Sequence, residues 1–333
     1  MIVTFTPNPS LDRTIELGAP LQRGEVQRAV AARSEPGGKG VNICRALAAS
    51  GIASLAILPG DAHDPVLTAL TDQSIPHLAL PVQAPLRSNI TITEPDGTTT
   101  KLNEPGPALT QDQQLALIDL VVQQSVGASW LVLAGSLPPG VPDDFYVRII
   151  GRVRERLGDN APQVAVDSSG GPLAAAALAQ PDLLKPNGEE LAELSGLFDG
   201  ATLEANPLLV VEAARVLIEG GVKAVLATLG SNGAVLVTAN GSWLATTPPI
   251  TAVSTVGAGD CALAGYLLAR TSGGSTAESL RQATAHGAAA ASLPGSTVPA
   301  LHHTNPQAVT VTDIAPVLAV RPALTPHPKE DDQ

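Results

Sequence analysis

The chain has 333 residues, with 19 lysines and arginines against 31 aspartates and glutamates, and its formal net charge at pH 7 is −12. No basic run interleaved with aromatic residues occurs, no apolar stretch is long enough to span a bilayer, and only two cysteines are present, Cys44 and Cys261. The sequence therefore argues against a nucleic acid partner, a membrane protein and a disulfide framework. Without a basic segment typical of a signal peptide at its start, it predicts a cytoplasmic protein.

Short β-branched or aliphatic runs alternate with longer alanine-rich segments, which is typical of a mostly parallel sheet covered by helices. The candidate strands are Ile2–Thr6, Ser54–Leu58, Trp130–Leu133, Gln163–Val166, Leu183–Leu184, Val222–Thr228 and Ala234–Thr238. The candidate helices are Val41–Ser50, Pro65–Asp72, Asp112–Gln124, Asp144–Leu157, Glu189–Ser195, Pro207–Glu219, Cys261–Thr271 and Ala277–Ser292. We expect a single α/β domain over residues 1–320, with a doubly wound, mostly parallel sheet flanked by helices.

Two segments interrupt this alternation. Residues 24–35 contain alternating short hydrophobic side chains, and residues 89–93 and 98–102 resemble two strands joined by Asp96-Gly97, a hairpin signal. We expect residues of about 10–35 and 87–104 to form a small β-sheet lid that shields a ligand from water. An ordinary edge hairpin is the alternative. Residues 321–333, rich in proline and charge, are expected to be a disordered tail.

Two motifs near the beginning of the chain could bind a polar, phosphorylated ligand. Asp12 follows the first strand in Asn-Pro-Ser-Leu-Asp and could accept two hydroxyl groups, although aspartate is also a common turn residue. In Pro-Gly-Gly-Lys-Gly-Val-Asn, Gly37 and Gly38 let the backbone approach a ligand, Lys39 can neutralise a phosphate, and Asn42 can donate and accept. The alternative for this motif is a glycine-rich turn with a solvated lysine.

Further candidates for the same ligand follow along the chain. Arg87-Ser88-Asn89 opens the hairpin, and the Arg87 guanidinium could bind a phosphate through two hydrogen bonds, although a lone arginine there is more often a surface residue. Ser136 offers a hydroxyl in Gly-Ser-Leu-Pro-Pro-Gly, after a candidate strand. Rigidity of this loop is the alternative interpretation.

Two later motifs are suited to a nucleotide. Lys185-Pro-Asn-Gly-Glu-Glu follows a strand and enters a helix, so Lys185 could bridge phosphates, and Asn187 and Glu190 could hold Mg²⁺ directly or through water. The same residues suit a helix N-terminus equally well. Thr228-Leu-Gly-Ser-Asn-Gly, which contains Gly230 and Gly233, is expected to form a turn between two strands with room for a nucleotide, or a plain hairpin turn.

The last motif is Thr-Val-Gly-Ala-Gly-Asp, which ends at Asp260 and opens an apolar helical run. Gly257 and Gly259 let the backbone approach a ligand, and free amides at the start of the helix favour negative charge on a transferring phosphoryl group. Asp260 could then accept a proton from an attacking hydroxyl. A tight turn whose aspartate only favours the helix start is the alternative.

In this order along one chain, the motifs resemble the PfkB carbohydrate kinase family of ribokinase-like fold, over roughly residues 1–300. Within the family the chain most resembles the hexose-phosphate kinases, especially bacterial 1-phosphofructokinases. The resemblance implies ATP-dependent phosphoryl transfer to a hydroxyl of a sugar phosphate, and a lid often shared in a homodimer. It also implies that Asp260 is the catalytic base and that the amides of Gly257, Ala258 and Gly259 form an anion hole.

The resemblance assigns the other candidates to two groups. The candidate sugar-phosphate contacts are Asp12, Gly37, Gly38, Lys39, Asn42, Arg87, Asn89 and Ser136. The candidate nucleotide contacts are Lys185, Asn187, Thr228, Gly230 and Gly233. Asn187 and Glu190 match the family's Asn-x-x-Glu magnesium signature.

The leading hypothesis is phosphorylation of fructose 1-phosphate at its 6-hydroxyl by MgATP, with Lys39 and Arg87 holding the existing phosphate. By the same resemblance, Lys39 favours this substrate or tagatose 6-phosphate. The kinases of these two sugars carry a lysine at this point of the motif, whereas the minor bacterial 6-phosphofructokinase looks glycine-only there. Fructose 6-phosphate is a further alternative. A non-catalytic sugar-phosphate sensor is the alternative from another class, whereas the first strand is not followed by the G-x-G-x-x-G that a nicotinamide oxidoreductase would carry.

Overall fold

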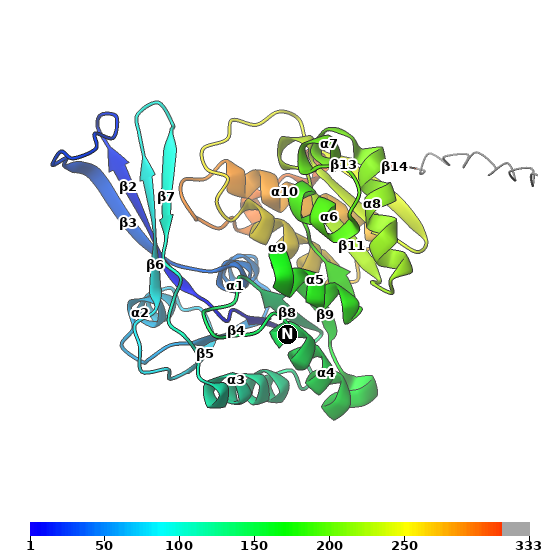
Figure 1. The fold of residues 1–333 in the computed structure, drawn as a ribbon. Coiled ribbons are helices and arrows are strands. Elements are labelled where there is room, and N and C mark those ends of the chain that lie inside the picture. The colour runs from blue at the N-terminus through cyan, green and yellow to red at the C-terminus, as the bar shows by residue number, and fades with distance from the viewer. Residues whose placement is uncertain (315–333) are drawn as a thin grey trace, which may run out of the picture.

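The computed structural model describes residues 1–314. Its main sheet has ten strands within these residues (Figure 1). In spatial order they are β14 (Thr310–Asp313), β13 (Gly241–Thr246), β12 (Ala234–Thr238), β11 (Ala224–Thr228), β10 (Leu183–Leu184), β9 (Gln163–Asp167), β8 (Trp130–Ala134), β1 (Ile2–Phe5), β4 (Ser54–Pro59) and β5 (His77–Leu80). The strands from β11 to β5 are parallel, and β12, β13 and β14 are antiparallel to their neighbours.

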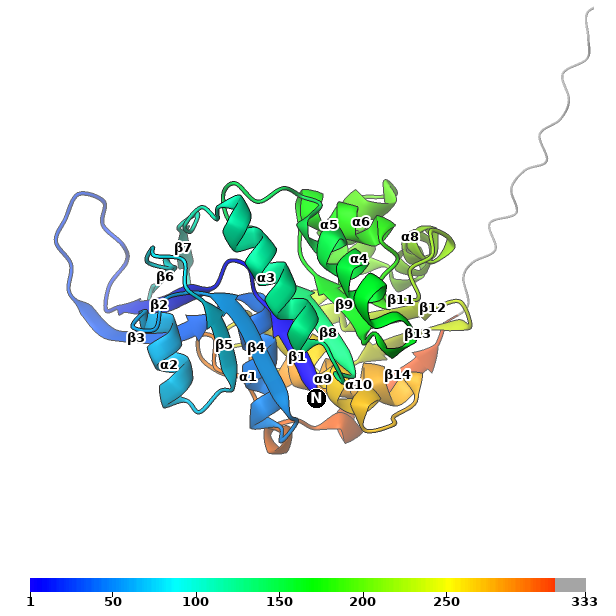
Figure 2. The same cartoon turned by 90° about the horizontal axis from the view of Figure 1, so that it is seen from below.

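Helices cover both faces of this sheet (Figure 2). The helices are α1 (Lys39–Ala49), α2 (Pro65–Asp72), α3 (Gln111–Gln124), α4 (Phe145–Leu157), α5 (Gly170–Leu178), α6 (Gly188–Ser195), α7 (Gly200–Ala205), α8 (Pro207–Glu219), α9 (Ala258–Thr271) and α10 (Thr276–Ala291). Alternate residues of a strand point to opposite faces. Val3 and Phe5 therefore belong to the core cluster that also contains residues of α3, α4 and α8, whereas Ile2 belongs to the cluster on the other face, with residues of α1, α9 and α10. The predicted doubly wound α/β class is confirmed.

A second, four-stranded sheet stands to one side of the main body in Figure 1. Its order is β3 (Ala29–Gly37), β2 (Ser10–Leu17), β6 (Arg87–Thr93) and β7 (Thr99–Asn103). β2 pairs antiparallel with β3 and parallel with β6, and β6 and β7 form the expected hairpin. β2 and β3 are the chain segments that lead from β1 to α1, so this sheet is anchored at the carboxyl end of β1.

Several elements were missing from the sequence-based expectations. The strands β5, β13 and β14 have four to six residues and include half-exposed positions, so their hydrophobic pattern is weak. Helix α5 begins with Gly-Gly-Pro, which is typical of a loop, and α7 has only six residues. The tail expected at 321–333 lies outside the described residues.

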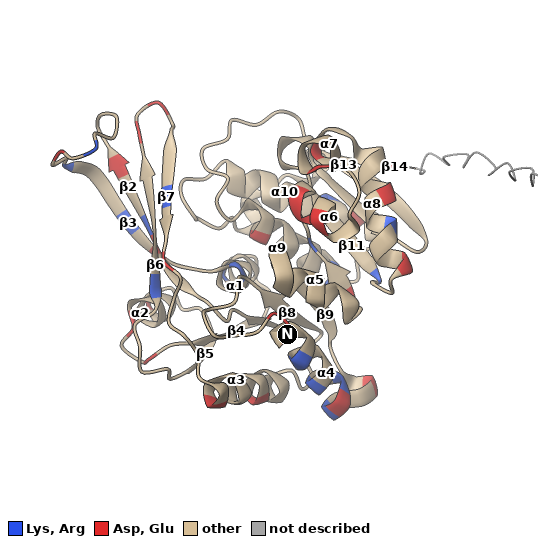
Figure 3. Ribbon diagram, viewed as in Figure 1, with Lys and Arg blue, Asp and Glu red and all other residues tan. Residues whose placement is uncertain are grey.

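Lysine and arginine are distributed over many elements, and acidic residues accompany them on α4 and also lie on α6 and α8 (Figure 3). Any concentration of positive charge at a site therefore depends on individual side chains. Within residues 1–314, no helix combines the length and the apolar composition that crossing a membrane requires.

Candidate active site

The glycine loop before α9 lies beside a buried carboxylate. Gly257 is the N-cap of α9 and has a left-handed backbone with φ of 75°, a conformation that favours glycine. The first N–H to bond four residues back is that of Cys261, which donates to the Gly257 carbonyl at 2.9 Å, and Ala258 N–H donates to Thr255 O at 3.3 Å. The N–H groups of Gly259 and Asp260 therefore belong to the first turn, which lacks intrahelical acceptors. This arrangement is suited to an anion.

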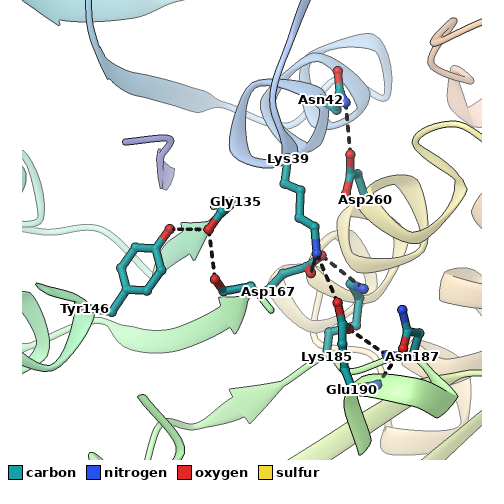
Figure 4. A network of polar contacts seen from close by, with 10 residues as sticks. Lys39, Asn42, Gly135, Tyr146, Asp167, Lys185, Asn187, Glu190 and Asp260 are labelled. Carbon is teal, nitrogen blue, oxygen red and sulfur yellow. Dashed lines mark hydrogen bonds and ion pairs between the residues drawn. The ribbon is translucent and has the colours of Figure 1, made fainter. Parts of the chain in front are cut away.

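Asp260 is 7% exposed and its Oδ2 accepts a hydrogen bond from Asn42 Nδ2 at 2.9 Å (Figure 4). Burial and the neighbouring charge of Asp167 raise the pKa of the Asp260 carboxyl to about 7, although Lys39, Asn42 and Lys185 oppose the rise. A carboxylate with a pKa near 7 is well matched to general base catalysis near neutral pH.

Asp167 ends strand β9 and is fully buried between two lysines. Its Oδ1 accepts from Lys39 Nζ at 2.7 Å, and its Oδ2 lies 3.0 Å from Lys185 Nζ (Figure 4). Burial alone would raise the pKa of Asp167, but the two ammonium groups hold it below its ordinary value. Likewise, burial would lower the pKa of Lys39, but Asp167, Glu190 and Asp260 raise it. The Asp167 carboxylate and the Lys39 ammonium group therefore both stay charged in the folded protein.

Asn187 and Glu190 begin helix α6 as a reciprocal cap. Asn187 Oδ1 accepts from Glu190 N–H at 2.8 Å, and Glu190 Oε2 accepts from Asn187 N–H at 2.9 Å. The contacts of this pair therefore match the alternative in which both residues cap the start of a helix. The other oxygen of Glu190, Oε1, lies 3.8 Å from Lys39 Nζ and points into the charged cluster (Figure 4).

Magnesium in nucleotide sites is held by one or two carboxylates together with phosphates and water. Among residues 1–314, no group of three or more histidine, cysteine, aspartate or glutamate side chains is arranged to hold a metal alone. Glu190 Oε1 fits the more open kind of site, whereas the side-chain oxygen of Asn187 is used by the helix cap. Glu190 is therefore the better of the two predicted ligands.

A second polar group lies at the base of the four-stranded sheet. Asp12 Oδ1 accepts from Ser10 Oγ at 2.7 Å and from Asn89 Nδ2 at 3.0 Å. Burial raises the pKa of Asp12, while these hydrogen bonds and the nearby Arg87 lower it. A side chain at Gly37 would displace the Asp12 carboxylate, because a Cβ there would lie 2.2 Å from Asp12 Oδ2. This group brings together four of the eight predicted sugar-phosphate contacts, namely Asp12, Gly37, Arg87 and Asn89.

Arg87 and Ser136 are tied to the loop after β1. Arg87 Nε donates to Asn8 O at 3.2 Å and its Nη1 donates to Glu104 O at 3.2 Å. Ser136 Oγ accepts from Asn8 Nδ2 at 3.4 Å. Asn8, which the sequence analysis did not single out, therefore connects the two candidates, and its Oδ1 is buried without a hydrogen-bond partner among the described residues.

Lys39 and Arg87 have different polar partners in the structure. Lys39 and Arg87 were expected to hold one phosphate together, but the polar contacts of Lys39 are with Asp167 and Glu190. Its loop starts α1 beside the sugar motif, and the long side chain extends toward the nucleotide motif (Figure 4). Gly38, the N-cap of α1, has φ of 108° and lies close to Thr6.

The remaining nucleotide candidates lie at the end of β11. Thr228 forms an isolated parallel bridge with Asn187, and its N–H donates to Pro186 O at 3.0 Å. Gly230 and Gly233 form the expected turn between β11 and β12, with Leu229 N–H donating to Gly233 O at 2.9 Å. Gly233 has φ of 94°, and a Cβ there would lie 2.0 Å from Ala245 O. Its glycine is therefore explained by the turn itself.

The sequence and the fold are both similar to those of known proteins. The family described as pfkB family carbohydrate kinase matches residues 6–303. The chain is 35% identical over 320 residues to a 1-phosphofructokinase of Haloferax volcanii, which covers 94% of this chain and 99% of the relative. It is 33% identical over 299 residues to an ATP-dependent 6-phosphofructokinase isozyme 2 of Mycobacterium tuberculosis, which covers 88% and 85%. Its fold matches phosphofructokinase-2 from Escherichia coli in complex with substrates and products, with a TM-score of 0.82, 31% identity, and coverage of 91% and 96%.

Proposed function

The chain belongs to the pfkB family of carbohydrate kinases and is a hexose-phosphate kinase, and on that premise we propose that it transfers the γ-phosphoryl group of ATP to the 6-hydroxyl of fructose 1-phosphate. The observation that carries the proposal is the position of Asp260. This buried carboxylate, with a pKa of about 7, lies at the start of α9 and faces the charges of Lys39 and Lys185. Phosphoryl transfer requires a positioned proton acceptor and positive charge near the transferring group.

In the proposed reaction, an Asp260 oxygen accepts the proton of the sugar 6-hydroxyl as the O6–P bond forms. The bond between the γ-phosphorus and the β–γ bridging oxygen breaks, and ADP leaves with that electron pair. The first-turn amides of α9, including that of Gly259, would stabilise the transferring group, and Lys39 and Lys185 would neutralise the developing charge. Glu190 would hold Mg²⁺, directly or through water, and the ion would neutralise the phosphates of ATP.

The proposed sugar-phosphate site lies at the base of the second sheet. Asp12 and Asn89 would bind the sugar hydroxyls, and Arg87 would bind the existing phosphate. With Lys39 beside Asp167, we assign that lysine to the phosphoryl group in transit, and Arg87 alone to the phosphate of the acceptor. The four-stranded sheet would cover the site and exclude water, which favours transfer to sugar over hydrolysis.

The choice of sugar rests on the relatives. Fructose 1-phosphate is favoured by the 1-phosphofructokinase relative, which spans nearly the whole chain. Fructose 6-phosphate is the second candidate, since the isozyme 2 relative is almost as similar.

A coupled assay for ADP release tests this proposal with fructose 1-phosphate, fructose 6-phosphate and tagatose 6-phosphate. The expected result is the highest kcat/KM for fructose 1-phosphate. A higher value for either other sugar would replace the substrate, and tight sugar-phosphate binding with no ADP release would instead support a sensor. Asp260→Ala is expected to lower kcat by about 10²–10⁴-fold with little change in sugar binding.

We also propose that the second sheet mediates a homodimer. Val26, Val30 and Leu102 lie on or beside its strands with 98%, 68% and 54% of their surface exposed. Burying these side chains against a second copy would remove apolar surface from water. Sedimentation of Val30→Glu against the unchanged protein tests this, since a dimer through this sheet should dissociate in the variant.

A further inference from the structure

Arg45 is a buried cation in the middle of helix α1. Only 4% of it is exposed, although an arginine is rarely buried unless it is paired. Its acceptors are Gln73 Oε1 at 3.0 Å, Pro36 O at 3.2 Å, Ser296 O at 3.3 Å, Asn42 Oδ1 at 3.4 Å and Glu35 Oε1 at 3.5 Å. Glu35 also accepts from Ser296 Oγ at 2.6 Å. This set of partners restrains the guanidinium from several sides.

The amide of Asn42 lies between this guanidinium and Asp260. Asn42 Oδ1 accepts from Arg45 Nη1, and Asn42 Nδ2 donates to Asp260 Oδ2 at 2.9 Å. A guanidinium can only donate hydrogen bonds, and an ionised carboxylate can only accept them. Turning the amide over would therefore face its NH₂ toward Arg45 and its oxygen toward the carboxylate, which is unfavourable at both ends.

We propose that Arg45 is a positioning residue that holds the Asn42 amide with its nitrogen toward Asp260, so that the ionised form of the base keeps a hydrogen-bond donor. Glu35 belongs to β3 and lies two residues before Gly37. The same contacts therefore connect the base of the second sheet to the carboxylate of α9. The inference rests on the proposed function for the role of Asp260 as base.

Other charged and titratable groups face Asp260 from neighbouring elements. They are Asp167 at the end of β9, Lys39 in α1, Lys185 after β10 and the Cys261 thiol next along α9. The influences on the Asp260 carboxyl are burial, the charges of Asp167, Lys39 and Lys185, and the Asn42 hydrogen bond. Arg45 contacts Asp260 through Asn42, and its charge also acts on the neighbouring Cys261, so the test below separates the positioning effect from the effect of charge.

The test is a ¹³C NMR titration of carboxyl groups in the substrate-free protein, with the Asp260 signal assigned from Asp260→Asn. Arg45→Met removes the donors and keeps an unbranched side chain, so the amide can turn and the Asp260 pKa should rise by about one unit. Arg154→Met is the matched control, because Arg154 also donates to two backbone carbonyls, those of Ala179 and Gln180, on an exposed surface. It should leave the Asp260 pKa unchanged.

A double-mutant cycle separates positioning from other effects. Asn42→Ala should itself raise the Asp260 pKa, and adding Arg45→Met to it should raise the pKa no further. A folded Arg45→Met protein with the unchanged pKa, or a full additional rise in the double variant, would overturn the proposal.

Should Arg45→Met not fold, Glu35→Gln decides the question. It removes the charge that faces Arg45 Nη2 and should give a smaller rise of the Asp260 pKa, whereas Glu155→Gln, which alters an exposed ion pair with Arg152, should give none. An unchanged pKa in Glu35→Gln would overturn the inference. Because the titration needs no substrate, its failure is distinct from a failure to transfer phosphate from ATP.

Discussion

Asp260→Asn should make the protein more stable at alkaline pH while it abolishes most activity. The carboxyl has a pKa of about 7 in the folded protein, against an ordinary value of 3.8. This difference of about three units corresponds to about 4 kcal/mol at 1.36 kcal/mol per unit. The side chain is buried, so solvent does not screen this cost.

The sign follows from the raised pKa. Well below pH 3.8 the carboxyl is protonated in both the folded and the unfolded state, so its ionisation contributes nothing to the free energy of unfolding. As the pH rises toward 7, the unfolded chain ionises first, and the folded state loses stability until the pH passes the folded-state pKa. Asparagine stays neutral and can still accept the hydrogen bond from Asn42, so the variant should not lose stability in this window.

Urea unfolding of both proteins measures the difference. At pH 8 the variant should be more stable by up to about 4 kcal/mol. At pH 5 it should be more stable by less than half of that, because this pH is only about one unit above the unfolded-state pKa of 3.8. Asp119→Asn, on the exposed face of α3, is the control and should leave stability within about 0.5 kcal/mol at both pH values. A gain of equal size at pH 5 and pH 8, or no gain at pH 8, would refute the reasoning.

Three further predictions follow from buried groups and close contacts. Asp167→Asn should cost about 3–5 kcal/mol of stability near neutral pH, since it leaves two lysines without their buried counter-charge. Because the pKa of Asp167 is lowered in the folded protein, unfolding experiments should show this cost shrink as the pH falls below 3.8 and vanish once the pH has passed the folded-state pKa. Gly37→Ala should raise KM for the sugar phosphate about tenfold or more, because the added Cβ displaces Asp12. Gly151→Ala, at an open position of α4, is the control and should leave KM unchanged. Equal KM values for the two variants in kinetic assays would contradict the role of this contact. Burial lowers the pKa of His286 from 6.5 to about 4, so the protein should lose about 3 kcal/mol of stability as the pH falls through that range. His286→Gln should remove this pH dependence in the same unfolding assay. An unchanged dependence of the unfolding free energy on pH would assign the effect to other groups.

The α/β fold could be predicted from the sequence because its central strands are short and apolar and are separated by helical segments. Leu183–Leu184 and Pro207–Glu219 were predicted with the observed bounds. The strands at the edges were missed, because an edge strand such as His77–Leu80 is only partly buried and carries little hydrophobic signal. The second sheet was detected through Asp96-Gly97, whose turn preference is local.

The site could be predicted only where local signals were sufficient. Asp12 was proposed because it follows a strand, and the same rule would have singled out Asp167, which ends β9. Arg45 gave no such signal, since an arginine in a helix is ordinarily solvated, and its burial depends on Ser296, far along the chain. The direction of Lys39 was also beyond local reasoning, because a long flexible side chain can reach either neighbouring group.

The buried pairing of one carboxylate with two lysines bears on how Asp260 can work as a base. Without substrate, Lys39 and Lys185 lower the pKa of Asp260 and Asp167 raises it. A bound triphosphate would place negative charge beside the same lysines, and their effect on Asp260 would weaken. The carboxylate would then hold a proton more strongly when the phosphoryl donor is present than when it is absent. In the proposed reaction Asp167, which forms ion pairs with both lysines, would hold them close together before ATP binds, so that the positive charge would need no reorganisation during the transfer.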